Sequence, residues 1–221
     1  MQITTTRNRN HALRASIFAG AAYALLAFGT VACGKPNDPQ LTDGCTYKYS
    51  SEGTTLKWTA YKFTEKVGVS GTFDRYEVTG NESGTTAREA VAGLRFKIDS
   101  LSVNSGVPDR DAKISREFFG TMQNAGSISG HVKSVTDDGT GVISLEFNNQ
   151  TRDLPVTYTL TDNVNLTVKS SLNVNDWAAE ASLKALNKVC EALHTSADGK
   201  SVLWPDVSVE INAVLQRDCA Q

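Results

Sequence analysis

The sequence predicts an all-β fold, an antiparallel barrel of about eight strands with one short and one longer helical excursion. The main evidence is a series of short segments, from residue 56 to residue 215, in which apolar and polar residues alternate. Turn residues such as Gly80, Gly84 and the run Asp137-Asp138-Gly139 separate these segments. Neither an internal repeat nor a second domain is visible, so a single barrel is the economical interpretation.

Each alternating segment predicts a strand with one buried face. In the first segment Leu56, Trp58 and Ala60 share one face, and a second segment runs from Val67 to Phe73. Residues 94–99 alternate strictly between apolar and charged side chains. Further alternation appears around residues 128–135, 142–147, 156–160, 164–172 and 207–215.

Two segments predict helices instead. Pro108 opens a short helical stretch that extends to Phe119, with Asp109 as its expected N-cap. The longer helix is predicted from about Asp176 to His194, because apolar residues recur there at spacings of three and four. These apolar positions are Ala179, Leu183, Leu186, Cys190 and Leu193.

Residues 1–32 predict a secretory signal peptide. Residues 1–14 carry three arginines and no acid, and residues 15–32 are uncharged and mostly apolar, with small residues before Cys33. This arrangement resembles a bacterial lipobox, in which Cys33 would be diacylated and become the new N-terminus, although Thr30 stands where most such boxes have Leu. A simple signal peptide or an uncleaved anchor is the alternative. Gly34, rather than Asp, resembles a signal for sorting to the outer membrane, so we expect a periplasm-facing lipoprotein of the cell envelope.

The remaining chain is predicted to be a tethered single domain. Residues 33–53 are interpreted as the lipidated cysteine and a polar linker, and residues 54–221 as the barrel domain. Removal of residues 1–32 leaves 19 basic and 24 acidic residues, a net charge of −5. Because no basic face is apparent, nucleic acid is not an expected partner, and attachment to the membrane must come from the lipid.

Several short motifs, taken in order, resemble a known family. They are the run of residues 69–73, the strand of residues 94–100, the pairs Arg110-Asp111 and Phe118-Phe119, the proline-containing turn of residues 151–156 and the last strand, residues 207–211. Their order and spacing, over about residues 54–216, resemble the YceI-like proteins. Lys113 departs from the pattern, since the family commonly has His shortly after the Arg-Asp pair.

The resemblance implies an extended lipocalin-like barrel that holds an isoprenoid or similar apolar lipid. Such a ligand is held by apolar burial, so the site needs neither a charged anchor nor a catalytic motif. No cofactor is expected beyond a bound isoprenoid or quinone-like lipid. Phe118 and Phe119 are expected at the barrel mouth. The other candidates could line a cavity or equally fill the core: Phe73, Leu94, Phe96, Ile98, Leu145, Phe147, Tyr158 and Leu160.

The sequence offers little support for an enzyme or a metal protein. After residue 33 the histidines are His131 and His194, too few for a three-histidine metal site. Glu191 and His194 have the spacing of a di-iron motif, but a second matching pair is missing. No nucleophile elbow, P-loop or dinucleotide fingerprint occurs. We therefore expect no catalytic activity.

The cysteines predict a disulfide at the barrel seam. Cys45 precedes the first predicted strand and Cys219 follows the last, and these strands pair antiparallel if an even-stranded meander closes. We favour a Cys45–Cys219 bond, which leaves Cys190 as a buried free thiol. A Cys190–Cys219 bond is the alternative.

Three functions are compatible with these observations: a lipid-carrying lipoprotein, an envelope interaction or stress-response module with a filled barrel, and a small-molecule enzyme on the same fold. The first requires a continuous apolar cavity. The second requires a filled core and an exposed patch, and the third requires ionisable groups in a pocket.

Overall fold

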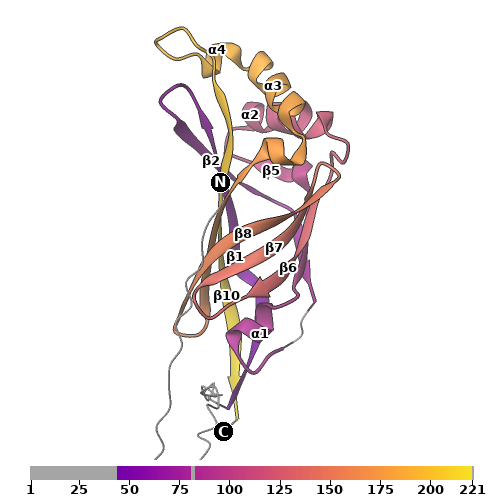
Figure 1. Cartoon of the computed structure of the whole chain (residues 1–221), viewed down its shortest axis with the longest axis vertical. Helices are drawn as coiled ribbons and strands as arrows, with labels where there is room; N and C mark the ends of the chain where they lie inside the picture. The colour runs from indigo at the N-terminus through magenta and orange to yellow at the C-terminus, as the bar shows by residue number, and fades with distance from the viewer. Residues whose placement is uncertain (1–43, 81–82, 221) are drawn as a thin grey trace, which may run out of the picture. The chain divides into compact units, whose positions relative to one another are not determined.

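The computed structural model describes residues 44–80 and 83–220, and within them a single antiparallel sheet of ten strands curls into a half-barrel (Figure 1). The order across the sheet is β3-β4-β6-β7-β8-β9-β10-β1-β2-β5. The strands are β1 (Cys45–Lys62), β2 (Val67–Phe73), β3 (Tyr76–Thr79), β4 (Arg95–Ile98), β5 (Val103–Asn104), β6 (Ile128–Val135), β7 (Thr140–Phe147), β8 (Gln150–Thr161), β9 (Asn165–Asn173) and β10 (Leu203–Cys219).

The predicted β class and antiparallel pairing are confirmed, but the prediction of eight strands in a closed barrel is wrong. β5 has two residues, too few to show an alternating pattern. β3 has four, as many as β4, and its Tyr76 and Val78 do alternate with Glu77 and Thr79, a pattern that was not recognised as a strand. β3 and β5 form the free margins of the sheet, which is therefore open.

The two margins are brought near each other by the short link between β2 and β3. The backbone N–H groups of Asp74 and Arg75 donate to the carbonyl and hydroxyl oxygens of Ser102, at 2.9 and 3.0 Å. The Arg75 guanidinium also donates to the carboxylate of Asp99 at 2.6 Å. In a closed barrel the two margins would be joined by strand pairing. Here the hydrogen bonds of the β2–β3 link connect them instead.

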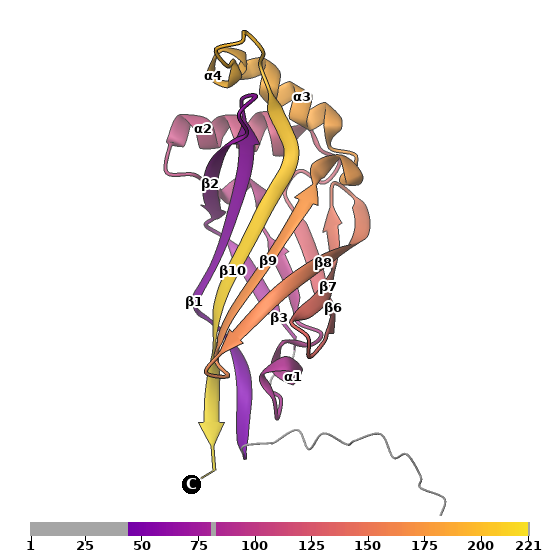
Figure 2. The ribbon, with the colours of Figure 1, turned by 60° about the vertical axis from the view of Figure 1, so that its left-hand side comes forward.

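β1 and β10 form the longest pair, from Cys45 opposite Cys219 to Lys62 opposite Leu203, with register shifts between Ser50 and Thr55 and between Ala60 and Lys62 (Figure 2). A disulfide joins Cys45 to Cys219, as predicted, and Cys190 is a buried free cysteine. β1 thus begins at Cys45, although the sequence placed the start of the domain at residue 54. The glycine and serines of residues 50–53 hide this start, because they interrupt the alternation where β1 bulges away from β10.

Helical segments lie at both ends of the half-barrel (Figures 1 and 2). The short helix α1 (Ala87–Val91) lies at one end, where Thr86 caps it by accepting from the Glu89 N–H at 3.2 Å. α2 (Pro108–Lys113), α3 (Glu180–Val189) and α4 (Glu191–His194) lie at the other end. The sequence did not predict α1, because a single turn shows no helical period.

The first predicted helix continues beyond Lys113 as a π-helical turn, Ile114–Phe118, and a 3₁₀ turn, Phe119–Thr121. Its predicted N-cap is wrong: Pro108 takes the first helical position, and the cap residue Val107 makes no side-chain hydrogen bond. Asp109 lies in the first turn instead and pairs with Lys113 at 2.8 Å.

The predicted helix of residues 176–194 is broken twice. A 3₁₀ turn, Val174–Trp177, precedes the left-handed residue Ala178, and α3 ends where α4 begins, at Cys190. Leu193 is therefore not on the buried face and is 57% exposed. Among the described residues, no helix is both long and apolar enough to cross a membrane.

Candidate functional site

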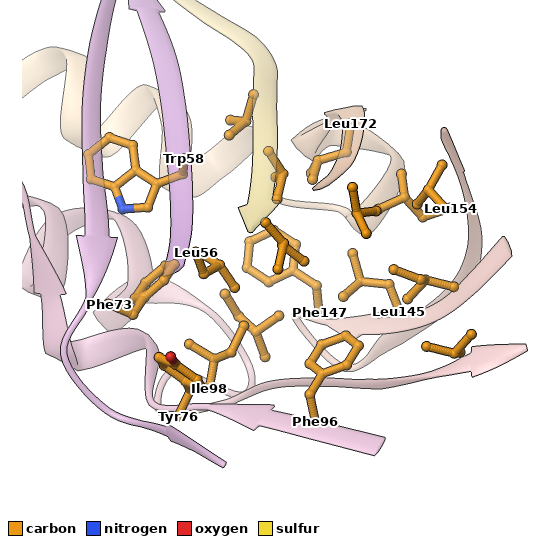
Figure 3. Close-up of a pocket in the computed structure, with 18 of the residues that line it drawn as sticks. Leu56, Trp58, Phe73, Tyr76, Phe96, Ile98, Leu145, Phe147, Leu154 and Leu172 are labelled. Atoms are coloured by element: carbon orange, nitrogen blue, oxygen red, sulfur yellow. The ribbon is translucent and has the colours of Figure 1, made fainter. Parts of the chain in front are cut away.

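The concave side of the sheet encloses a cavity of ≈ 320 Å³ whose wall is almost entirely apolar (Figure 3). All ten strands of the described residues contribute to this wall, and α1, α3 and the π-helical turn close parts of it. The volume lies at the lower end of the range typical of small-molecule pockets. The molecule therefore combines a β scaffold with an unfilled apolar interior.

The alternation of the strands produces this wall directly. Along β8 the inward residues are Leu154, Val156, Tyr158 and Leu160. Along β10, alternate residues from Val207 to Leu215 face the cavity, a span of roughly 26 Å at ~3.3 Å per residue. An elongated apolar wall of this kind fits an extended chain better than a compact ligand.

Aromatic side chains gather at the end of the cavity that carries α2 and α3. The ring centroids of Phe118 and Phe119 lie 5.0 Å apart, and Phe119 contacts Phe73 at 6.0 Å and Phe147 at 6.4 Å. The helical turns after α2 supply the first two rings, and β2 and β7 supply the others. These contacts are edge-on, the arrangement that aromatic pairs prefer.

At two places on the wall, an aromatic ring lies directly against a glycine of the neighbouring strand. Trp58 lies over Gly71 on the neighbouring strand, and its indole N–H donates to the carbonyl of Thr72 at 3.0 Å. Phe96 lies over Gly130 in the same way. In both places a β-carbon would occupy the space of the ring, so the glycine permits the large side chain to lie flat.

All ten predicted cavity residues lie on this wall: Phe73, Leu94, Phe96, Ile98, Phe118, Phe119, Leu145, Phe147, Tyr158 and Leu160. Several further wall residues were not among the predicted cavity candidates, notably Leu56, Trp58, Val156, Leu172 and Val207. Their inward position could have been inferred from the alternation that predicted their strands. Cys33 and residues 1–32 lie outside the described residues.

The few polar groups on the wall are mostly satisfied by other parts of the protein. The Tyr76 hydroxyl donates to the carbonyl of Thr54 at 2.9 Å, and that of Tyr158 donates to the carbonyl of Thr136. Burial raises the pKa of both phenols above the ordinary value, and the nearby Tyr49 adds to the rise in the pKa of Tyr76. Both side chains are therefore neutral at physiological pH.

Charge is nearly absent from the wall. The Arg88 side chain reaches it but forms an ion pair with Asp137. No group of three or more His, Cys, Asp or Glu side chains within residues 44–80 and 83–220 could hold a metal ion.

His194 does not line the cavity. It is a buried residue that is held by a side-chain hydrogen bond. Its Nδ1 lies 2.8 Å from Oδ1 of Asn187. Burial, aided by the positive charge of Lys62, lowers the pKa of His194 to about 4. The imidazole is therefore neutral near pH 7, and the Glu191–His194 spacing has no metal-binding partners around it in this part of the chain.

Solved structures resemble the fold at low sequence identity. A polyisoprenoid-binding domain from Saccharophagus degradans, implicated in plant cell wall breakdown, matches with a TM-score of 0.51 and 15% identity, over 80% of this chain and 99% of that one. BcnA of Burkholderia cenocepacia matches with a TM-score of 0.49 and 10% identity, over 76% and 99% of the two chains. A Campylobacter jejuni YceI protein gives 0.46 and 17%, over 70% and 87%.

The comparison with curated proteins found no match to this chain. The model of the YceI-like domain, in contrast, matches residues 47–215, from the start of β1 almost to the end of β10. That range contains every strand that lines the cavity, and the chain therefore belongs to the YceI-like family.

Proposed function

We propose that this protein is an envelope lipoprotein that binds an isoprenoid or similar apolar lipid inside its half-barrel, for storage or for transport across the periplasm. The continuous apolar cavity of ≈ 320 Å³ carries this proposal. The polyisoprenoid-binding domain from Saccharophagus degradans, which shares the fold, is consistent with it.

Apolar burial alone can supply useful affinity. Each buried methylene contributes ~0.8 kcal/mol, so about a dozen contribute roughly 10 kcal/mol. Micromolar binding needs about 8 kcal/mol, and the loss of motional freedom on association offsets part of the gain. A ligand with a long hydrocarbon chain is therefore required, which agrees with the length of the wall along β10.

The cavity weighs against the two other functions. An interaction module with a filled barrel would have no unfilled apolar interior. An enzyme would need several ionisable groups in the pocket, whereas within the described residues the ionisable side chains on the wall are Arg88, which is paired, and three tyrosines. A bound lipid, in contrast, needs only the apolar surface that the wall provides.

The location is part of the same proposal. Lipidation at Cys33 would hold the domain at a membrane surface facing the periplasm, at the outer membrane if Gly34 acts as the sorting signal. A Cys45–Cys219 disulfide suits that oxidising compartment. Metabolic labelling with a fatty-acid analogue, compared between the wild type and Cys33→Ser, tests the anchor separately from lipid binding.

Native mass spectrometry of the full-length protein tests ligand binding. We expect an added mass that organic solvent releases as one apolar species. Val156→Trp places an indole in the cavity and should abolish the added mass, while Thr157→Trp, one residue along β8 on the outer face, should retain it. A wild type that carries no lipid and takes up no added polyprenyl lipid would contradict the proposal.

A further inference from the structure

One polar group on the cavity wall is left without a partner. The hydroxyl oxygen of Tyr49 is buried, and among the described residues it has no hydrogen-bond partner. Tyr49 lies on β1 opposite Leu215 and lines the cavity. A buried hydroxyl that makes no hydrogen bond costs about 1–3 kcal/mol, so its presence on an apolar wall calls for an explanation.

The surroundings of Tyr49 form a small polar corner. Tyr76 is close enough for its pKa to respond to Tyr49, but its own hydroxyl is already bonded to the carbonyl of Thr54. Thr54 belongs to the bulged part of β1, where the strand leaves its register with β10. Its side-chain hydroxyl donates to the carbonyl of Ser50 at 2.8 Å and is therefore also engaged. The Tyr49 hydroxyl remains the free group of this corner.

The corner and the aromatic cluster lie in different parts of the cavity. Tyr49 packs against the buried cluster that contains Val91, Leu94 and Leu215, at the α1 end of the half-barrel. Phe118 and Phe119 belong to the other buried cluster, beneath α2 and α3. A long chain in the cavity can therefore have its polar head at Tyr49 and its tail among the phenylalanines.

Charge limits what that head can be. Arg88 is the cation on the wall, and the carboxylate of Asp137 already pairs with it. A phosphate or carboxylate at Tyr49 would lose its hydration without gaining a counter-charge, which is strongly unfavourable. An uncharged carbonyl or hydroxyl oxygen needs only the one hydrogen bond that the phenol can donate.

We infer that the Tyr49 hydroxyl is the hydrogen-bond anchor for an uncharged oxygen on the head of a long-chain lipid whose tail extends to the aromatic cluster. This inference rests on the proposed function and refines its substrate class. A long-chain alcohol, ester or quinone presents the required oxygen, and a lipid phosphate does not.

Binding titrations of the full-length protein test the inference, with tryptophan fluorescence as the signal because Trp58 and Trp204 line the cavity. The three probes are geranylgeraniol, geranylgeranyl monophosphate and phytane, an isoprenoid hydrocarbon of the same carbon count without oxygen. The wild type should bind the alcohol most tightly. Tyr49→Phe should lower the affinity for the alcohol by about 5-fold, the equivalent of one hydrogen bond, and leave the affinity for phytane unchanged.

Tyr158→Phe is the matched control, since it removes a phenol hydroxyl from the same wall that is already bonded to the carbonyl of Thr136. It should not change the ratio of alcohol to hydrocarbon affinity. An unchanged ratio in Tyr49→Phe, or a wild type that prefers the phosphate, would overturn the inference while leaving lipid binding intact. A wild type that binds none of the three probes would overturn the proposed function as well.

Discussion

Trp58 and Gly71 face each other across the β1–β2 pair, and the indole ring occupies the space that a side chain at residue 71 would need. The backbone carbonyl of Asn104 closes the same space from β5. The position of Trp58, and with it one side of the cavity, therefore depends on the absence of a β-carbon at Gly71.

Gly71→Ala should lower the free energy of unfolding by about 1–3 kcal/mol, because the added methyl displaces the indole or the β5 backbone. Urea denaturation followed by circular dichroism measures the loss. Gly126→Ala is the control, since a β-carbon there meets no atom within 4 Å. Equal stability of the two variants would show that Trp58 can move away from a methyl group at residue 71 without loss of stability.

Cys45→Ser should remove the crosslink and lower the stability by roughly 3–5 kcal/mol, because the bond closes a loop with a sequence separation of 174. Cys190→Ser should retain the crosslink. Peptide mapping without reduction detects the Cys45–Cys219 pair directly. A crosslink that survives in Cys45→Ser and disappears in Cys190→Ser would contradict this pairing.

The stability should also fall as the pH falls from 6.5 towards 4. The folded state holds the pKa of His194 at about 4 instead of 6.5, so the unfolded chain takes up a proton in this range that the folded protein does not. The full shift corresponds to about 3 kcal/mol.

Denaturation midpoints at a series of pH values measure this loss, with His194→Gln as the comparison. The variant should lose the pH dependence from 6.5 to about 5, above the range in which carboxyl groups with a lowered pKa, such as Glu210, contribute. Below pH 4 the stability of both the wild type and the variant should fall, because carboxylates such as Asp99, whose pKa is lowered by Arg75, become protonated. Parallel curves from pH 6.5 to 4 would contradict the assignment to His194.

Tyr49→Phe should raise the stability of the lipid-free protein by about 1 kcal/mol, because it removes a buried hydroxyl that has no partner. Thermal unfolding after delipidation gives the sign of the change. Tyr76→Phe should act in the opposite direction, since its hydroxyl is bonded to Thr54. A loss of stability in Tyr49→Phe would mean that its hydroxyl is already satisfied.

The sequence predicted the long strands and their faces well, because a half-buried strand shows its buried face at every second residue. β4 and the inward residues of β8 follow that pattern, and the predicted candidates from these strands lie on the cavity wall. The sequence could not decide between a filled core and an open cavity. The same apolar side chains serve either, and the difference lies in how far the sheet curls.

The features that were not predicted are short or irregular. β5 and α1 are two and five residues long, and no periodicity can be recognised over such lengths. β3 is as long as β4, and the alternation of Tyr76 and Val78 with Glu77 and Thr79 was an available signal that was missed. Tyr49 lies in the segment interpreted as linker, although Cys45, Tyr47 and Tyr49 already alternate with the exposed Thr46 and Lys48. That alternation was the available signal for the start of β1.

The Cys45–Cys219 bond also determines how the domain bears mechanical load. Because the hydrogen bonds between β1 and β10 lie perpendicular to the strands, a force that draws the start of β1 sideways, away from β10, would load the outermost bond first and open the pair one bond at a time. The covalent bond holds these two ends together, so opening from this end is blocked and a force along the strands acts on β1 and β10 together. The ladders to β2 and β9 must now yield in shear, many bonds at once, so a domain pulled ahead of Cys45 resists extension as a unit.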